Sequence, residues 1–259
     1  MPFIDIPDRL EAGAARFHYE DVTMGMESAP VALIALHGRF GTANADLPDL
    51  IQWLAPTYRV IGPSLRGYGQ STPKPRDYPS DFYHRDARDV LAFMDALGIE
   101  KAHLIGYSDG GETALVAAGL APERFLSVAV WGAVGYFGPD MRPWVQRNYP
   151  ATWMDAATKA LNGIDDPNPI VLQWVQACKF MIDSGGDVSL SLAPAISCPV
   201  LLMLGERDNL NPQAYGQQFI DATPHGQLVM FGTGHGCHDE APEQFKQVLG
   251  AFLKAADGG

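Results

Sequence analysis

Six short segments of this sequence are continuously apolar, rich in Val, Ile and Leu, and ended by Gly or Pro. Strands with one face in water alternate apolar and polar residues, whereas strands covered on both faces are apolar throughout. The pattern therefore predicts a mostly parallel sheet between two layers of helices. The six segments are residues 30–38, 58–65, 102–108, 126–134, 199–206 and 227–234.

The segments between these strands carry helical signals. Residues 81–99 place apolar side chains on one face of a helix, and residues 112–121 are rich in helix formers. A third predicted helix, residues 242–256, opens with a proline, which suits the first helical position. The alternation of strand and helix predicts a doubly wound α/β fold, with residues 17–25 adding an antiparallel strand at the edge.

Residues 135–196 interrupt this alternation, because they read as helical segments without a strand signal. An insertion between two strands at the carboxyl edge of the sheet lies over the place where α/β folds bind ligands. We therefore expect a helical lid at 135–196, inserted into an α/β core made of residues 1–134 and 197–259. The lid holds three of the five tryptophans: Trp144, Trp153 and Trp174.

The formal net charge of -12 and the pI near 4.8 indicate an acidic surface. Such a surface repels phosphate backbones and anionic lipids, so neither nucleic acid nor a membrane is an expected partner. No signal peptide is recognisable, and no apolar run reaches the ~18 residues of a transmembrane helix. The three widely spaced cysteines contain no C-x-x-C pair, so neither a disulfide framework nor a zinc ribbon is indicated. We expect a cytoplasmic protein, with a homo-oligomer left open.

The motif Gly106-Tyr107-Ser108-Asp109-Gly110 lies between a predicted strand and a predicted helix. A turn this sharp strains the serine backbone and projects its hydroxyl above the sheet, while the glycines remove side chains that would clash. The hydroxyl then lies at the positive end of the following helix. In this context the motif predicts that Ser108 is a nucleophile and not simply part of a glycine-rich turn.

Two glycine patterns in the sequence come close to nucleotide-binding loops. The nucleophile loop spaces its glycines as a phosphate-binding loop does, but Glu112 stands where that loop needs a lysine to meet the phosphates. Gly67 and Gly69 are followed by Thr72 instead of the third glycine of a dinucleotide fingerprint. Neither pattern therefore predicts nucleotide binding.

A serine hydroxyl needs a base within hydrogen-bond reach before it can act as a nucleophile. Asp208 follows the predicted strand 199–206, and His235 follows the predicted strand 227–234. Both therefore lie at the same edge of the sheet as Ser108, and the chain order Ser, Asp, His suits this arrangement. The sequence predicts His235 as base and Asp208 as the residue that orients it.

Three nearby residues are the alternatives for these two roles. His238 is the one serious competitor of His235, but it lies past the glycines of the loop and is followed by Asp239. That position suggests a supporting residue. Glu206 and Asp239 are the alternatives to Asp208, which has the loop position that reaches across to the histidine.

The transition state of acyl transfer needs amide donors for its oxyanion, and losing one donor costs roughly 3 kcal/mol. The backbone N–H of Asp109, directly after the nucleophile, is one expected donor. The second is expected in the loop that begins His37-Gly38. We expect the N–H of Arg39 there, with that of Phe40 as the alternative.

These motifs together resemble the α/β-hydrolase superfamily over nearly the whole chain. The one departure is Ser64, which stands where relatives usually carry an aspartate, a change that concerns loop packing and not the chemistry. GYSDGG followed by VWGAVGYF is most similar to the branch that contains valacyclovir hydrolase, also called biphenyl hydrolase-like protein. The matching segments are His37-Gly38, PSLRGYGQS (63–71), GYSDGG (106–111), VWGAVGYF (130–137), GERDNLNP (205–212) and GHGCHDEAPEQF (234–245).

The resemblance implies a catalytic triad of Ser108, His235 and Asp208, a helical lid, no metal and no cofactor. In the valacyclovir hydrolase branch, an acidic residue beside the nucleophile is implicated in holding the amino group of aminoacyl esters. Asp109 is the candidate for that contact here, unless it only complements the positive end of the helix. The residues expected to bind substrate are Phe40, Asp109, Trp131, Trp144 and Trp174.

The function expected from these residues is that of a small-molecule carboxylesterase, which works through an acyl-enzyme intermediate. The alternatives that use the same triad are a lactonase, an aminoacyl-ester hydrolase, a carbon–carbon bond hydrolase and a perhydrolase. A non-catalytic receptor with this fold is a less favoured alternative, because such proteins typically lose a member of the triad.

Overall fold

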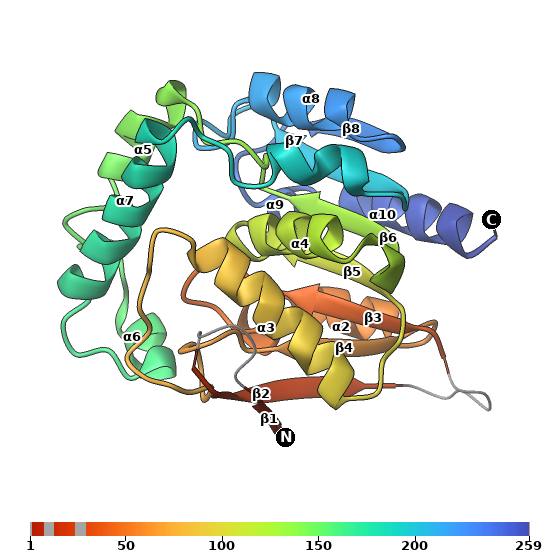
Figure 1. The fold of residues 1–259 in the computed structure, drawn as a ribbon, viewed down its shortest axis with the longest axis horizontal. Helices are drawn as coiled ribbons and strands as arrows, with labels where there is room; N and C mark the ends of the chain where they lie inside the picture. The colour runs from red at the N-terminus through yellow and green to blue at the C-terminus, as the bar shows by residue number, and fades with distance from the viewer. Residues whose placement is uncertain (1, 8–12, 24–29, 259) are drawn as a thin grey trace.

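The computed structural model describes residues 2–7, 13–23 and 30–258, and its centre is a sheet of eight strands (Figure 1). Six of these strands run parallel, and they pair in the order β4, β3, β5, β6, β7 and β8. In spatial order the strands are β1 (Phe3–Ile6), β2 (Ala15–Val22), β4 (Arg59–Pro63), β3 (Ala32–Leu36), β5 (Ala102–Tyr107), β6 (Phe125–Trp131), β7 (Val200–Gly205) and β8 (Gly226–Phe231).

These six strands, β3 to β8, thus form five parallel pairs, whereas β1 and β2 pair antiparallel at one edge. The mostly parallel α/β fold predicted from the sequence is confirmed.

The edge of the sheet differs in detail from the prediction. The strand expected at 17–25 corresponds to β2, which begins two residues earlier, and residues 24 and 25 lie outside the described residues. Strand β1 was not expected, because its four residues are too few to show a pattern. Both strands belong to the antiparallel edge and lie away from the loops that carry the predicted site.

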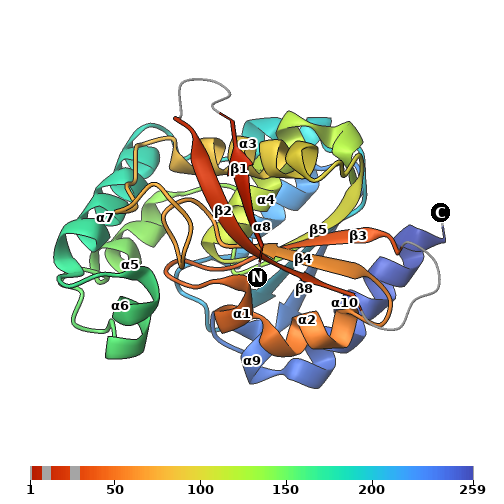
Figure 2. The ribbon, with the colours of Figure 1, turned by 90° about the horizontal axis from the view of Figure 1, so that it is seen from below.

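Helices cover both faces of the sheet, as Figure 2 shows. Because side chains of a strand point alternately to its two faces, the buried apolar residues form two clusters, one under each layer. One layer consists of α3 (Phe82–Ala96), α4 (Asp109–Leu120) and α8 (Gln213–Ala222). The other consists of α1 (Ala43–Asp46), α2 (Pro48–Leu54), α9 (Cys237–Glu240) and α10 (Pro242–Asp257). The described residues also form three short 3-10 helices: η1 (Pro122–Arg124), η2 (Pro139–Met141) and η3 (Leu190–Ala195).

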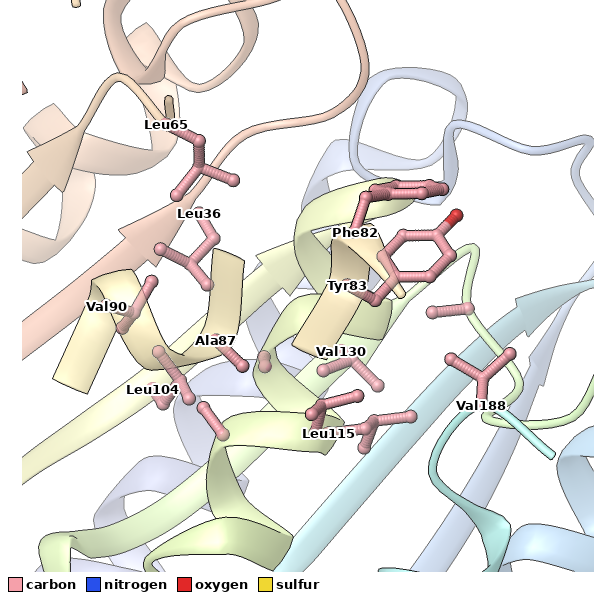
Figure 3. Packing of buried hydrophobic residues seen from close by; sticks show 14 of the residues in the cluster. Leu36, Leu65, Phe82, Tyr83, Ala87, Val90, Leu104, Leu115, Val130 and Val188 are labelled. Atoms are coloured by element: carbon pink, nitrogen blue, oxygen red, sulfur yellow. The ribbon is translucent and has the colours of Figure 1, made fainter. Parts of the chain in front are cut away.

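Helix α4, which begins directly after Ser108, is buried along almost its whole length. Leu115 of α4 and Val90 of α3 belong to the cluster that packs over Leu104 and Val130 of the central strands (Figure 3). A helix that is apolar on all sides is a core helix, and its position is fixed by packing from several directions. This packing holds the turn that carries Ser108 in place.

Residues 135–196, which we call the cap, contain no strand, and their three α-helices lie beyond one end of the sheet (Figures 1 and 2), whereas η3 packs against α4 and α8. An isolated bridge between Tyr136 and Asp187 joins the start of the cap to the segment between its last α-helix and η3. The predicted interruption of the strand–helix alternation is therefore present, whereas its boundaries and its role as a lid stay predictions. The helices of the cap are α5 (Arg142–Gln146), α6 (Ala156–Asn162) and α7 (Asn168–Asp183).

The loop that departs from the family pattern at Ser64 packs through other bonds. The hydroxyl of Ser71 donates to the carbonyl oxygen of Ser64 over 2.6 Å. Arg66 donates two hydrogen bonds, of 2.6 and 2.8 Å, to the carboxylate of Asp89 on α3. The loop is thus tied to the core without the usual aspartate.

No helix in the described part of the chain is both long and apolar enough to cross a membrane. The cysteines Cys178, Cys198 and Cys237 are free and buried.

Candidate active site

Ser108 occupies the turn that joins β5 to α4, with φ 54° and ψ -122°. A residue with a side chain rarely adopts a positive φ, so this backbone is strained. The motif glycines are required because the chain folds closely on itself here. A Cβ on Gly106 would lie 2.4 Å from the carbonyl oxygen of Gly110, and a Cβ on Gly110 would lie 2.4 Å from that of His37.

Ser108, His235 and Asp208 form one hydrogen-bonded row. The hydroxyl oxygen of Ser108 lies 2.9 Å from Nε2 of His235, and Nδ1 of His235 lies 2.7 Å from Oδ2 of Asp208. The three residues follow β5, β8 and β7, whose carboxyl ends meet at one edge of the parallel sheet. The structure therefore brings together the three side chains that the sequence singled out, at distances that suit proton transfer.

The carboxylate of Asp208 is buried and held by several donors. Besides His235, the side-chain amide of Asn211 donates to Oδ2 over 2.9 Å, and the backbone N–H of Leu210 donates to Oδ1 over 3.0 Å. Burial acts to raise the pKa of Asp208, but these hydrogen bonds outweigh it, and the pKa lies below its ordinary value. The carboxylate is thus ionised at neutral pH and can hold Nδ1–H of the histidine.

His238, the alternative base, belongs to a different set of contacts. Its Nδ1 accepts a hydrogen bond of 3.0 Å from the indole N–H of Trp131, and its ring packs 4.6 Å from that of Tyr107. Burial lowers the pKa of His238, which keeps it neutral. Of the two histidines in this loop, His235 is the one that the structure places against Ser108.

The loop after β3 is held in shape by a buried histidine. The ring of His37 donates from Nδ1 to the carbonyl oxygen of Gly38 over 2.7 Å and accepts at Nε2 from the backbone N–H of Leu65 over 2.9 Å. Burial lowers the pKa of His37 to about 4, so the ring stays neutral and Nε2 remains an acceptor. The neutral ring of His37 thus holds the loop after β3 to the loop that carries Leu65.

Asp46 supports the same loop from the other side. Its Oδ2 accepts a hydrogen bond of 2.9 Å from the backbone N–H of Gly38. A Cβ on Gly41 would overlap this carboxylate, so the glycine is required by close approach. The turn itself is closed by a bond from the N–H of Gly41 to the carbonyl oxygen of Gly38 and contains Phe40 at φ 64°.

The predicted oxyanion donors lie where these two loops meet. Asp109 is the first residue of α4, and the first amides of a helix have no acceptor within the helix. The neighbouring residue, Gly110, packs directly against the carbonyl of His37, so the nucleophile turn and the loop after β3 are in contact. The roles of Asp109 and Arg39 as amide donors stay predictions, with Phe40 still the alternative to Arg39.

A narrow pocket lies beside Ser108, between the core and the cap. Only about 10 Å³ of it admits the centre of a water molecule, so side chains fill nearly all of the pocket. It is lined by Tyr83, Ser108, Asp109, Glu112, Gly132, Phe137, Met141, Val145, Trp174, Leu210 and Asn211. Two predicted substrate-binding residues, Asp109 and Trp174, are among these.

The carboxylate of Asp109 is buried in this pocket and already has two donors. The hydroxyl of Tyr83 donates to Oδ1 over 2.9 Å, and the indole N–H of Trp174 donates to Oδ2 over 3.0 Å. Burial raises the pKa of Asp109, although the positive charge of Arg39 and these bonds oppose the shift. The side chain of Asp109 thus joins α4 to α3 and to the cap through hydrogen bonds. Its binding of a substrate ammonium group stays a prediction.

The structure corrects the predicted substrate contact of Trp131. Its side chain is fully buried in the cluster under the α10 layer, where its ring lies 4.9 Å from that of Phe245. It therefore points to the face of the sheet opposite to α4. Strand β6 is apolar on both faces, so its sequence could not indicate the direction of this side chain.

Phe40 and Trp144 are not among the residues that line the pocket beside Ser108. Phe40 is buried and packs edge-on against Tyr68, with ring centroids 5.9 Å apart. Trp144 is half-buried in the cap, and the guanidinium of Arg147 lies 4.2 Å from its ring centroid. Their predicted contacts with substrate stay predictions.

Most of the lining residues were not expected, and two of them, Tyr83 and Glu112, are polar groups with defined partners. Glu112 accepts hydrogen bonds from the backbone N–H groups of Val134 and Gly135 over 2.8 and 3.0 Å, which ties α4 to the chain after β6. Burial raises its pKa to about 7. A charged residue in an otherwise apolar helix was the available signal for Glu112, whereas nothing in the sequence marked Tyr83.

No group of three or more His, Cys, Asp or Glu side chains in the described ranges is arranged to hold a metal ion. The expectation of a cofactor-free enzyme stays a prediction.

Comparisons with known proteins agree with this fold. Residues 31–166 match the family model described as alpha/beta hydrolase fold. The chain is 30% identical to the serine hydrolase BPHL of Mus musculus, over 95% of this chain and 86% of the relative. It is 26% identical to 3-oxoadipate enol-lactonase 1 of Acinetobacter baylyi, over 89% of this chain and 91% of the relative.

Among solved structures, an esterase of Thermogutta terrifontis superposes with a TM-score of 0.73 at 20% identity, covering 99% of each chain. This likeness concerns the fold alone. The matched family model spans more than half of the sequence, and the serine hydrolase is 30% identical over 95% of it. The chain belongs to the α/β-hydrolase family.

Proposed function

We propose that the protein is a serine hydrolase that cleaves carboxylic esters through an acyl-enzyme intermediate. The observation that carries this proposal is the row of hydrogen bonds from Ser108 through His235 to Asp208. Ser108 is strained, half-buried and next to a pocket, as a nucleophile that must meet a substrate should be. The likeness to a serine hydrolase over 95% of the chain supports the same proposal.

In the proposed acylation step, Nε2 of His235 takes the proton of the Ser108 hydroxyl while the serine oxygen attacks the ester carbonyl. Asp208 keeps the other ring nitrogen protonated and stabilises the imidazolium that forms. The carbonyl oxygen becomes an oxyanion, for which the amides of Asp109 and Arg39 are the proposed donors. The tetrahedral intermediate then collapses: the bond to the alcohol oxygen breaks, and the alcohol leaves with the proton from His235.

In the proposed deacylation step, a water molecule takes the place of the alcohol. Its proton passes to Nε2 of His235, and its oxygen attacks the carbonyl carbon of the acyl-enzyme. When this second tetrahedral intermediate collapses, Ser108 recovers the proton and the carboxylic acid is released. Electrons and protons balance in both steps without any further reagent.

The cap is proposed to act as a lid over this site. Cap residues Phe137, Met141, Val145 and Trp174 close the pocket, and the space that remains next to Ser108 is smaller than an ester substrate. Entry of a substrate therefore requires these side chains, or the helices that carry them, to move. Closing a lid over bound substrate would also exclude bulk water from the oxyanion.

Covalent labelling with a fluorophosphonate tests the proposed function. The probe should modify Ser108 in the native protein, as identified by mass spectrometry, and should leave Ser108→Ala unlabelled. Hydrolysis of p-nitrophenyl esters should be lost in the same variant. A native protein that neither reacts with the probe nor hydrolyses any ester would be a binding protein with this fold, and the proposal would be wrong.

A lactone, which is a cyclic ester, is the second substrate class that we consider. The observation in its favour is the 26% identity to an enol-lactonase over 89% of the chain. The same two steps apply, except that the alcohol released in acylation remains attached to the acyl group. Measuring kcat/KM for linear esters, aminoacyl esters and lactones side by side would rank these classes.

A further inference from the structure

We propose that the side chain of Arg39 binds a carboxylate of the substrate, so that the preferred esters carry a second, negatively charged carboxyl group. This inference rests on the proposed esterase function and specifies the substrate class of the same site. It concerns the guanidinium of Arg39, whereas the oxyanion role considered above concerns its backbone N–H.

The side chain of Arg39 leaves the loop after β3 and reaches the cap. Its Nη2 donates a hydrogen bond of 2.6 Å to Oδ1 of Asn148, which follows α5. Its guanidinium carbon lies 3.7 Å from the ring centroid of Trp174 on α7. Trp174 also lines the pocket beside Ser108. The positive charge therefore lies against a wall of that pocket, at the seam between core and cap.

The other terminal nitrogen of this guanidinium, Nη1, is buried without an acceptor among the described residues. An arginine cannot lose its charge to relieve such burial, and a buried donor without a partner is costly. Aromatic rings surround the group further: the guanidinium carbon lies 5.3 Å from the ring of Trp153 and 5.4 Å from that of Phe40. In such apolar surroundings an anionic acceptor would bind more strongly than at an open surface.

Asp109 is the nearby acid that could have neutralised this charge, but its oxygens are bonded elsewhere. Oδ1 accepts from Tyr83 and Oδ2 accepts from Trp174. Its attraction to Arg39 acts on its pKa, yet burial prevails and the pKa is raised. The pocket thus contains an acid whose two oxygens already accept hydrogen bonds, and a base with a free donor lies against its Trp174 wall. This asymmetry favours an anionic substrate group over a cationic one.

The test compares esters of the same shape that differ in charge. The p-nitrophenyl monoester of glutaric acid carries a carboxylate where p-nitrophenyl 5-methylhexanoate carries an isopropyl group. We expect the native enzyme to show a kcat/KM about tenfold to a hundredfold higher for the glutarate ester, as for a hydrogen bond to a charged group. A ratio of one or below would overturn the inference for the acyl side.

A second pair of esters places the charge on the alcohol side. The acetate esters of 4-hydroxybutanoate and of 4-methylpentan-1-ol differ in the same way, with a carboxylate in place of an isopropyl group. A preference for the anionic ester in the first pair alone would place the bound carboxylate on the acyl portion of the substrate. A preference in the second pair alone would place it on the alcohol portion. If neither pair showed a preference for the anion, the inference would fail as a whole.

The variant Arg39→Met should bring the ratio of kcat/KM values close to one, whatever its effect on the absolute rates. The matched control is Arg147→Met, because Arg147 also lies over a tryptophan of the cap but is exposed. This control should retain the preference of the native enzyme. If Arg39→Met lowered kcat/KM equally for both esters of a pair and left their ratio unchanged, the guanidinium would only join the cap to the core, and the inference would be wrong.

Binding measured without hydrolysis separates this inference from the proposed function. Calorimetric titration of Ser108→Ala with glutarate should detect binding that is lost when Arg39→Met is added. Glutarate binding without any ester hydrolysis by the native protein would reject the esterase and keep the anion site. If the native protein hydrolysed esters but showed neither glutarate binding nor a preference for anionic esters, the esterase function would stand and the anion site would be rejected.

Discussion

Strand β5 carries a row of serine, histidine and aspartate at each of its two ends. The first row, at the carboxyl end, is Ser108, His235 and Asp208. The second row, at the amino end, is Ser127, His103 and Asp257. In the second row, Nδ1 of His103 lies 2.8 Å from the Ser127 hydroxyl and its Nε2 lies 3.0 Å from Asp257.

The two rows have the same residue types and similar distances, but their surroundings differ. Ser108 is half-buried at a positive φ, beside a pocket and at the start of α4. Ser127 lies within β6, paired in register with His103, and both side chains are fully buried. Asp257 accepts a further bond from the hydroxyl of Tyr58 over 2.6 Å, which ties the end of α10 to the sheet.

Hydrogen bonds alone therefore do not indicate a nucleophile. A reactive serine also needs access for substrate and amide donors where the oxyanion will form, and only the first row lies at such a place. A buried serine in a regular strand has its backbone amide engaged in the sheet and no room for a carbonyl. We assign the second row a structural role, as a clasp between the sheet and the last helix.

The largest contrast is expected when the two serines are removed. Ser108→Ala should lower kcat on a p-nitrophenyl ester on the order of a million-fold, because it removes the proposed nucleophile. Ser127→Ala should keep kcat within about twofold of the native value, since a buried side chain outside the site takes no part in the chemistry. Steady-state measurement of kcat with both purified variants tests this prediction. Comparable losses in the two would refute the distinction between the rows.

The second contrast concerns the two carboxylates. Asp208→Asn should lower kcat by about ten-thousand-fold, because an amide no longer holds Nδ1–H of His235 and leaves the wrong tautomer. Asp257→Asn should leave kcat unchanged and should only weaken the clasp. Steady-state kinetics of the two variants, with circular dichroism to verify folding, would test this. Near-native turnover by Asp208→Asn would argue against its orienting role.

The third contrast is in stability. His103→Ala leaves the buried hydroxyl of Ser127 without its partner and should lower the free energy of unfolding by about 2 kcal/mol. The activity of the folded fraction should stay native, because His103 lies at the opposite end of β5 from Ser108. Urea denaturation followed by tryptophan fluorescence gives the first quantity, and assays in buffer give the second. An unchanged midpoint would mean that the clasp contributes nothing.

The smallest expected effect is a pH dependence of the second row. Burial lowers the pKa of His103 below its ordinary value of 6.5, although Asp257 opposes the shift. Between the lowered pKa of His103 in the folded protein and 6.5, the unfolded chain binds a proton that the folded chain does not. The free energy of unfolding therefore falls as the pH decreases below 6.5. His103→Gln cannot bind this proton.

The advantage of the native protein over His103→Gln should therefore shrink as the pH is lowered from 7.5 to about 5. Denaturation curves of both proteins at several pH values would give this difference in the free energy of unfolding. The other histidines contribute equally to both proteins and cancel. A difference that stayed constant, or grew, towards acid pH would contradict a lowered pKa of His103.

The sequence predicted the parallel sheet, the nucleophile turn and the three members of the first row, because each depends on a local pattern. Continuous apolar runs give buried strands, and the parallel sheet then gathers the loops that follow them at one edge. Ser108, Asp208 and His235 could therefore be selected by their places after three strands. The same reasoning distinguished His235 from His238, which lies only three residues further along the chain.

The tertiary structure alone decided the contacts that join distant segments. A parallel strand with two apolar faces does not reveal its direction, so only the structure placed Trp131 away from the pocket. The second row joins residues 103, 127 and 257, and no local pattern relates them. The free donor of Arg39 likewise depends on how the cap packs against the core. Local chemistry fixes which elements form, whereas the fit between their surfaces fixes which side chains meet.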